Sequence, residues 1–132
     1  FLVFVDCVFQ EKRNSIDRKS GIIMPAFIVT ALVGVVCIVL GISNMKGNIS
    51  SLHSYHRNRV SEEDRLPFGK KVGLGTIIIG VAVIVFSGLS AVTLLTDNEI
   101  FTLIGTGILI AGIVVGLIIS FKAMIKYNKG IF

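Results

Sequence analysis

Three long stretches of the chain carry apolar residues at nearly every position and contain no charged residue. They lie within residues 22–42, 72–95 and 100–121. Each is about 20 residues long or longer, enough for a helix to cross the ~30 Å hydrocarbon core of a bilayer at ~1.5 Å per residue. Apolar residues cover all sides of each helix instead of one face, as is typical of helices surrounded by lipid. The pattern predicts three transmembrane helices, over about 24–42, 72–95 and 100–121.

The composition supports this prediction. Of the 132 residues, 53% are hydrophobic and 16% are charged, whereas about 25% are charged in a typical soluble domain. A soluble domain of this size buries only part of its chain and has no room for so much apolar surface. The sequence therefore predicts an all-α integral membrane protein, with residues 24–132 as a single three-helix domain.

The segment before the first predicted span has a different character. Residues 1–23 mix an apolar start, "FLVFVDCVF", with a charged block, and the first methionine is Met24. We expect the native product to begin at Met24 and residues 1–23 to be upstream sequence. The alternative is that this segment is the end of an earlier span. A secretory signal peptide is disfavoured. In such a peptide the charged residues precede the apolar part, whereas here they follow it.

Basic residues are distributed unevenly between the predicted loops. The loop 43–71 and the C-terminal tail together carry nine Lys and Arg residues, whereas the connection 96–99 carries none. Basic loops are retained on the cytoplasmic side. The sequence predicts a multi-pass protein of the bacterial plasma membrane, with the loop 43–71 and the C-terminus in the cytoplasm. The four basic residues within 1–21 fall on the opposite side and conflict with the rule.

The short connection between the second and third spans predicts how these two helices meet. A link of four residues requires adjacent, antiparallel helices. Thr96 and Glu99 have the spacing of a capping box, in which each side chain accepts a hydrogen bond from the other residue's amide.

Small residues recur at helical spacing within the predicted spans. Gly105, Gly112, Gly116 and Ser120 share one face of the third span, and Gly34 lies on the first. Small residues spaced by four let helix backbones approach closely in lipid. Such faces serve either dimerisation or packing among the chain's own helices; we favour internal packing, because glycine is frequent in transmembrane helices.

The loop carries the only residues that suggest site chemistry. His53 and His56 share a helix face, but a zinc site needs three or four ligands at fixed geometry, so no metal site is predicted. Residues 49–60 instead favour a short helix on the cytoplasmic membrane surface. The basic side chains there and beyond it are expected to contact anionic lipid headgroups; these are Arg57, Arg59, Lys70 and Lys71.

The end of the loop predicts a helix start. Residues 61–64 read as a polar turn, followed by Leu66 in an extended conformation and by Pro67 as the first residue of the next helix.

The stretch "YHRNRVSEEDRLPFGKKVGLGTIIIG" resembles a family of small membrane proteins, mostly from Firmicutes, whose domain is of unknown function. The matching pattern comprises Tyr55, Ser61, Glu62, Glu63, Lys70, Lys71 and Gly73. The resemblance extends over about residues 24–121, and it implies three spans and a cytoplasmic loop but no activity.

The sequence narrows the class of function. No ionisable residue lies within a predicted span, whereas ion-coupled transporters and voltage sensors need such groups at depth. Neither a phosphate-binding loop nor a nucleophile motif is present, so we predict no enzyme activity, no cofactor and no nucleic-acid binding. We expect an accessory or regulatory subunit that lies in a bilayer with an anionic inner leaflet and binds another membrane protein. The alternative is a homo-oligomer that forms a pore or transports small solutes.

Overall fold

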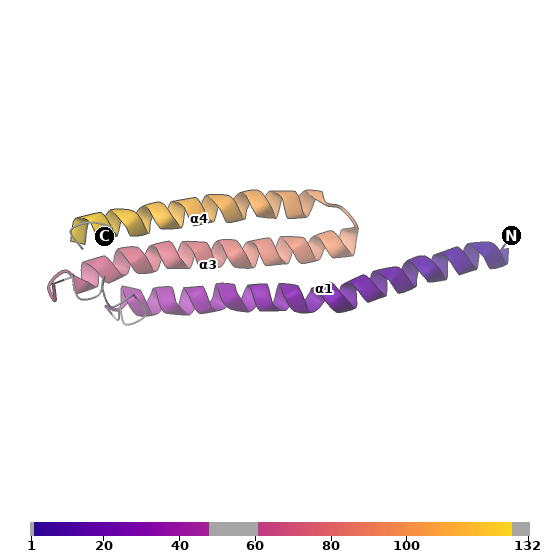
Figure 1. Cartoon of the computed structure of the whole chain (residues 1–132), viewed down its shortest axis with the longest axis horizontal. Helices are drawn as coiled ribbons and strands as arrows, with labels where there is room; N and C mark the ends of the chain where they lie inside the picture. Colours follow the sequence, from indigo (N-terminus) through magenta and orange to yellow (C-terminus); the bar gives the residue numbers. More distant parts are fainter. Residues whose placement is uncertain (1, 48–60, 128–132) are drawn as a thin grey trace.

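The structure, a computed structural model, describes residues 2–47 and 61–127 of the chain (Figure 1). These residues form three helices: α1 (Leu2–Met45), α3 (Arg65–Thr96) and α4 (Ile100–Tyr127). Helices account for 92% of the described residues, among which no strand occurs. The predicted all-α class is confirmed.

Three segments are long and apolar enough to cross a membrane: Pro25–Met45, Arg65–Thr96 and Ile100–Tyr127. They contain the three predicted spans and extend beyond them, most clearly at the start of α3 and at the end of α4. These extensions carry lysines, whose long aliphatic stems can lie along lipid while the charged ends reach water. The helices therefore continue past the apolar stretches from which the spans were predicted.

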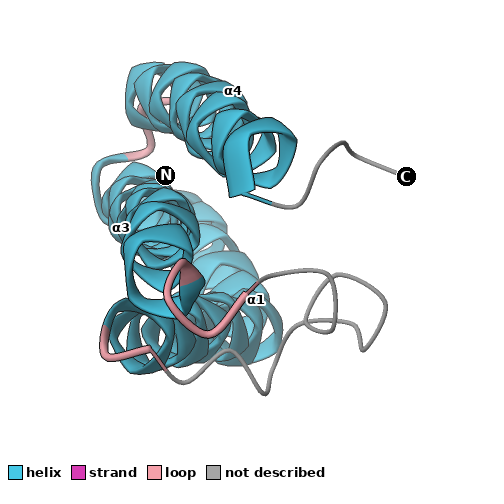
Figure 2. Cartoon of the chain, turned by 90° about the vertical axis from the view of Figure 1, so that its left-hand side faces the viewer, coloured by secondary structure: helices cyan, strands magenta, loops and turns pink. Residues whose placement is uncertain are grey.

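The three helices form a row with α3 in the middle. α3 packs against both α1 and α4, and the end-on view shows the three helices as an open arrangement (Figure 2). α3 and α4 lie antiparallel and adjacent, as the short link between them predicted. One consequence is that α1 and α4 each pack on one side only. Large hydrophobic side chains on their remaining sides are exposed.

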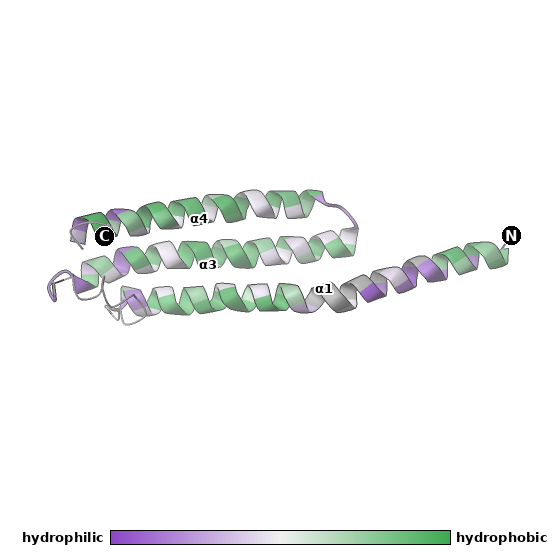
Figure 3. Cartoon of the chain, viewed as in Figure 1, coloured by the Kyte–Doolittle hydropathy of each residue, from purple (hydrophilic) through white to green (hydrophobic). Residues whose placement is uncertain are grey.

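α1 is much longer than a membrane is thick. Its 44 residues span ~66 Å at ~1.5 Å per residue. The first half of α1 projects past the end of the bundle at which α3 and α4 are joined (Figure 1). A hydrophilic band separates its apolar tip from the apolar second half (Figure 3). The helix continues through Pro25, where the proline removes one backbone hydrogen bond and favours a bend.

The start of α3 differs in part from the sequence prediction. Ser61 and Asp64 form the predicted polar turn: the Asp64 amide donates to the Ser61 carbonyl at 3.1 Å, and the Ser61 hydroxyl donates to the Asp64 carboxylate at 3.0 Å. However, the helix begins at Arg65, so Leu66 is helical and Pro67 is the third residue. The prediction of an extended Leu66 was wrong. Amides in a first helical turn lack an intrahelical acceptor, so a proline there costs no hydrogen bond and the helix can begin before Pro67.

The link between α3 and α4 does not form the predicted capping box. The Thr96 hydroxyl donates instead to the Val92 carbonyl of its own helix, at 2.8 Å. The Asn98 side-chain oxygen accepts a hydrogen bond from the Ile100 amide, at 3.1 Å. Asp97 is left-handed, with φ 54° and ψ 33°, and this conformation ends α3. Thr96 belongs to the helix that ends, and is therefore not placed to cap the one that begins.

Candidate functional site

Glycines bring the backbones of α1 and α3 into close contact. A Cβ atom at Gly34 would lie 2.8 Å from the Gly80 carbonyl oxygen, and one at Gly80 would lie 2.7 Å from the Gly34 carbonyl oxygen. Gly41 and Gly73 face each other in the same way: a Cβ at Gly41 would lie 2.7 Å from the Gly73 carbonyl oxygen. Side chains at these positions would push the helices apart, so glycine sets the spacing of this pair.

The α3–α4 contact uses the small residues predicted on the third span. A Cβ at Gly116 would lie 2.6 Å from the Gly75 carbonyl oxygen, and one at Gly75 would meet Gly116 and Ser120. A Cβ at Gly112 would meet Ala82, and one at Gly105 would lie 3.3 Å from the Cβ of Leu89. The structure thus places Gly34, Gly105, Gly112, Gly116 and Ser120 in contacts between helices of the same chain.

Two buried serines in the last third of α3 differ in their hydrogen bonding. Ser87 donates a hydrogen bond of 2.7 Å to the Phe27 carbonyl, which joins α3 to α1. Ser90 lies three residues further along and is as deeply buried, but its hydroxyl has no hydrogen-bond partner among the described residues. In the sequence both are small residues of a transmembrane helix, and nothing there distinguishes the paired serine from the unpaired one.

Aromatic and basic side chains meet where α3 begins and α4 ends. Phe68 is fully buried there with Val72 and Ala123. The rings of Phe68 and Tyr127 are in edge contact, with centroids 6.4 Å apart. The Nζ atoms of Lys71 and Lys126 lie 5.6 Å and 5.2 Å from the centroid of the Tyr127 ring.

We call the exposed lysines of α3 and α4 at this end of the bundle the lysine rim; they are Lys70, Lys71, Lys122 and Lys126. Lys70 and Lys71 are the predicted headgroup residues that the structure describes. Arg57 and Arg59 lie outside the described residues. Lys122 and Lys126 had been counted only toward the charge balance of the loops. Their position could have been found from the sequence spacing, because Ile108, Val115 and Lys122 follow one another at steps of seven residues.

An apolar groove of ≈370 Å³ runs between α3 and α4. We call it the α3–α4 groove; it is lined by Ile78, Val81, Ala82, Val85, Ile108, Ala111, Gly112 and Val115. The small residues Ala82, Ala111 and Gly112 create the hollow, because larger side chains on either side of them project further from the helices. The sequence prediction missed the groove, since it depends on which faces of α3 and α4 meet.

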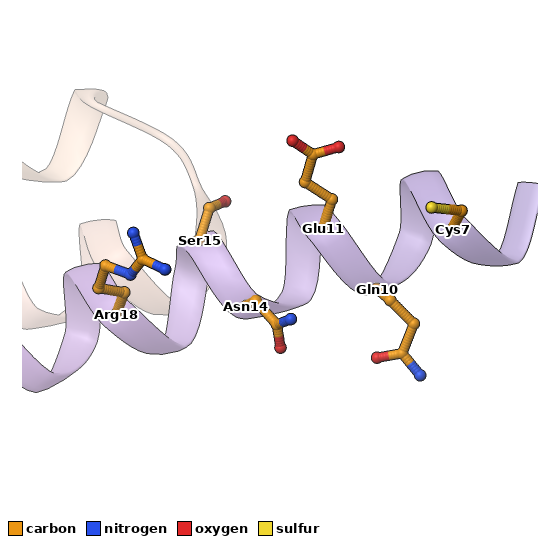
Figure 4. A pocket seen from close by; sticks show the side chains of 6 residues that line it. All are labelled: Cys7, Gln10, Glu11, Asn14, Ser15 and Arg18. Atoms are coloured by element: carbon orange, nitrogen blue, oxygen red, sulfur yellow. The ribbon is translucent and has the colours of Figure 1, made fainter.

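Two other hollows include polar side chains and lie toward the opposite end of the molecule. One of ≈650 Å³ adjoins the α3–α4 link and includes Thr93 and Thr102, whose hydroxyls are hydrogen-bonded at 2.8 Å. The other, of ≈580 Å³, follows the first half of α1 (Figure 4). Its six lining residues, from Cys7 to Arg18, all belong to α1, and in Figure 4 their side chains point in different directions. Among the described residues, no second element lines this hollow, so it does not form a site.

The predicted loop features fall largely outside the described residues. His53, His56 and the expected surface helix over residues 49–60 all lie there. Among the residues that the structure does describe, no group of three or more His, Cys, Asp and Glu side chains is placed to hold a metal ion. Cys7 is exposed and Cys37 is half-buried, and both are free thiols.

Comparison with protein families, with curated proteins and with solved structures finds no match to this chain. The resemblance to small Firmicutes membrane proteins therefore stays a prediction.

Proposed function

We propose that this protein is a non-enzymatic accessory or regulatory subunit of a larger complex in a bacterial plasma membrane. The observation that carries the proposal is the open row of helices. α4 packs against α3 on one side, which leaves the opposite side of α4 uncovered. A subunit of this shape can add its outer helix to the membrane domain of a partner without rearranging its own contacts.

The outer face of α4 has the composition of a helix-packing surface. A Cβ at Gly107 would meet no atom within 4 Å, so this glycine is not used inside the chain. Gly107 lies among exposed apolar side chains of the outer face: Leu103 is 68% and Ile110 58% exposed. A glycine beside projecting apolar side chains supports close approach of a helix from another protein.

The orientation proposed for this subunit places the lysine rim in the cytoplasm. All four rim lysines, together with Lys46, lie at the end of the bundle opposite the α3–α4 link. The link itself carries Asp97 and Glu99 and no basic residue. This distribution supports retention of the lysine-bearing end on the cytoplasmic side.

The test is a quantitative pull-down of the tagged full chain in a mild detergent, from the organism that encodes it. We expect one larger membrane protein at a fixed stoichiometry, and about tenfold less of it with Gly107→Leu. Gly88→Leu is the matched control, since a Cβ at Gly88 also meets nothing within 4 Å but lies on α3.

Three other results would contradict the proposal: no partner at fixed stoichiometry, equal retention by both variants, or recovery of the chain only as a homo-oligomer. A homo-oligomer that conducts ions in liposomes would favour the pore instead.

A further inference from the structure

The α3–α4 groove points directly at the lysine rim. From Val85, Val81 and Ile78 in the groove, steps of three or four residues along α3 lead through Leu74 to Lys71. These steps keep to one side of a helix. Leu74 is exposed, so the described residues leave the path open at this point.

The same register holds on α4. Ile108 and Val115 line the groove, and the next residue at the same spacing of seven is Lys122. Lys126 follows four residues later on the same side of the helix. Both helices therefore carry an apolar strip that ends in exposed lysines at the same end of the bundle.

The lysines converge on one aromatic ring. Because the Nζ atoms of Lys71 and Lys126 are both within 6 Å of the Tyr127 ring centroid, the two ammonium groups lie at most about 11 Å apart. The one ion pair among the described residues joins Arg65 to Glu62, at 3.8 Å. Neither Lys71 nor Lys126 is therefore in an ion pair with another described residue, and an anion between the two ammonium groups would be attracted to both.

The distance from the lysines to the far end of the groove is long enough to span one leaflet. Lys71 precedes Val85 by 14 residues, and Lys122 follows Ile108 by 14. Each strip is therefore ~21 Å long at ~1.5 Å per residue. Half of the hydrocarbon core measures ~15 Å, so a lipid with its phosphate at the lysines would lay its acyl chain along the groove.

We propose that the α3–α4 groove and the lysine rim together form a binding site for one anionic phospholipid, with its phosphate between Lys71 and Lys126 and one acyl chain in the groove. This site is independent of the proposed protein partner, which would bind the outer face of α4. The site combines two adjacent features, an apolar hollow and cations that have no ion pair among the described residues, and it has a single occupant.

The experiment is native mass spectrometry of the full chain in detergent, titrated with phosphatidylglycerol or with phosphatidylcholine of identical acyl chains. We expect one phosphatidylglycerol per chain, retained more strongly than phosphatidylcholine. Lys71→Gln with Lys126→Gln should lower this affinity about tenfold or more, since each lysine near the headgroups contributes ~1 kcal/mol. Lys46→Gln with Arg65→Gln removes the same charge at the same end and should change the affinity less than threefold.

A second pair of variants tests the acyl chain separately. Val115→Trp fills the groove without changing any charge, and should lower retention of both lipids. Its neighbour Val114 has nearly the same exposure, 49% against 46% for Val115, but lies outside the groove, so Val114→Trp should have no effect.

The proposal is overturned by equal binding of both lipids to the unaltered chain, or by equal losses in the two charge variants. It is also overturned if Val115→Trp abolishes a dimer instead of a lipid adduct, because the groove would then hold a second copy. Inorganic phosphate that competes as well as the lipid would equally exclude an acyl chain from the site.

Discussion

Gly80 is enclosed by α1 on a side where no side chain fits. A Cβ there would lie 2.7 Å from the Gly34 carbonyl oxygen and 2.9 Å from the Cγ1 atom of Ile38. Gly80→Ala should lower the free energy of unfolding by about 1–3 kcal/mol, the usual cost of overpacking. Unfolding of the detergent-solubilised protein by increasing SDS, followed by circular dichroism, measures the change.

Gly88→Ala provides the control for Gly80→Ala. Gly88 is on the same helix with open space around it. Alanine there should leave stability unchanged or raise it by up to ~1 kcal/mol through helix propensity. Equal destabilisation by both variants would show that α1 does not pack against α3 at Gly80.

Ser87 and Ser90 form a second matched pair. Ser87 is 4% and Ser90 5% exposed, but among the described residues only Ser87 has a hydrogen-bond partner, the Phe27 carbonyl. Ser87→Ala should cost about 0.6 kcal/mol and at most ~1.7 kcal/mol, the range for hydrogen bonds between transmembrane helices. Ser90→Ala removes an unpaired buried hydroxyl and should be neutral or stabilising. The same SDS unfolding experiment compares them, and a larger loss for Ser90→Ala would contradict the hydrogen-bond assignment.

The sequence identified the small residues but not their partners. Gly34 meets Gly80, and Gly41 meets Gly73. Seven residues forward along α1 thus correspond to seven residues backward along α3, as antiparallel packing requires. The register was in principle readable from this shared spacing. However, many pairs of glycines have compatible spacings, and only the packed helices select among them.

At the scale of elements, Asp97 is a position where the chain is strained. Asp97 follows the last residue of α3 and has a φ of 54°. Residues with a Cβ rarely adopt this left-handed conformation. Asp97→Gly should stabilise the α3–α4 hairpin by about 0.5–1 kcal/mol, because the relief of strain exceeds the entropy lost on folding. Asp97→Val should destabilise it by about 1 kcal/mol or more, since β-branched residues tolerate this conformation poorly.

Thermal unfolding in detergent distinguishes these two variants. The Tm should rise for Asp97→Gly and fall for Asp97→Val. Identical Tm values would mean that the left-handed conformation does not limit the stability of the hairpin.

The existence of the helices was predictable, whereas their ends were not. Uninterrupted apolar runs determine where a helix is surrounded by lipid, so all three spans were found. The ends depend on local hydrogen bonds: Asn98 caps the Ile100 amide in place of the Thr96–Glu99 exchange, and Pro67 is accepted within a first turn. Several such endings are compatible with one short polar sequence, and the surrounding structure decides among them.

At the scale of the whole molecule, the row arrangement follows from the middle helix. α3 has small residues on two opposite sides, with Gly73 and Gly80 toward α1 and Gly75 toward α4. Each side accepts one helix, so α1 and α4 are separated instead of closing a triangle. The sequence contained these positions. Without knowing that each side of α3 takes a different neighbour, however, we could predict neither the row nor the α3–α4 groove.

The shape of the molecule also makes its orientation testable with thiols that lie at opposite ends. Cys7 is exposed on the part of α1 that projects beyond the α3–α4 link, whereas Ser61 is exposed just before α3 begins. If the lysine rim faces the cytoplasm, a membrane-impermeant maleimide should label Cys7 in intact cells. The Cys7→Ser/Ser61→Cys variant should be labelled only after permeabilisation.

Cys37→Ala in both proteins removes the remaining thiol, so that each signal comes from one end of the molecule. The two ends are on opposite sides of the bilayer in either orientation, and the labelling pattern must therefore be reciprocal. Labelling of position 61 alone in intact cells would invert the orientation and place the lysines outside. Labelling of both positions in intact cells would mean that the three helices do not cross the membrane as one row. The orientation inferred from the charge asymmetry is therefore tested separately from the helix packing, because the failure of each would give a different labelling pattern.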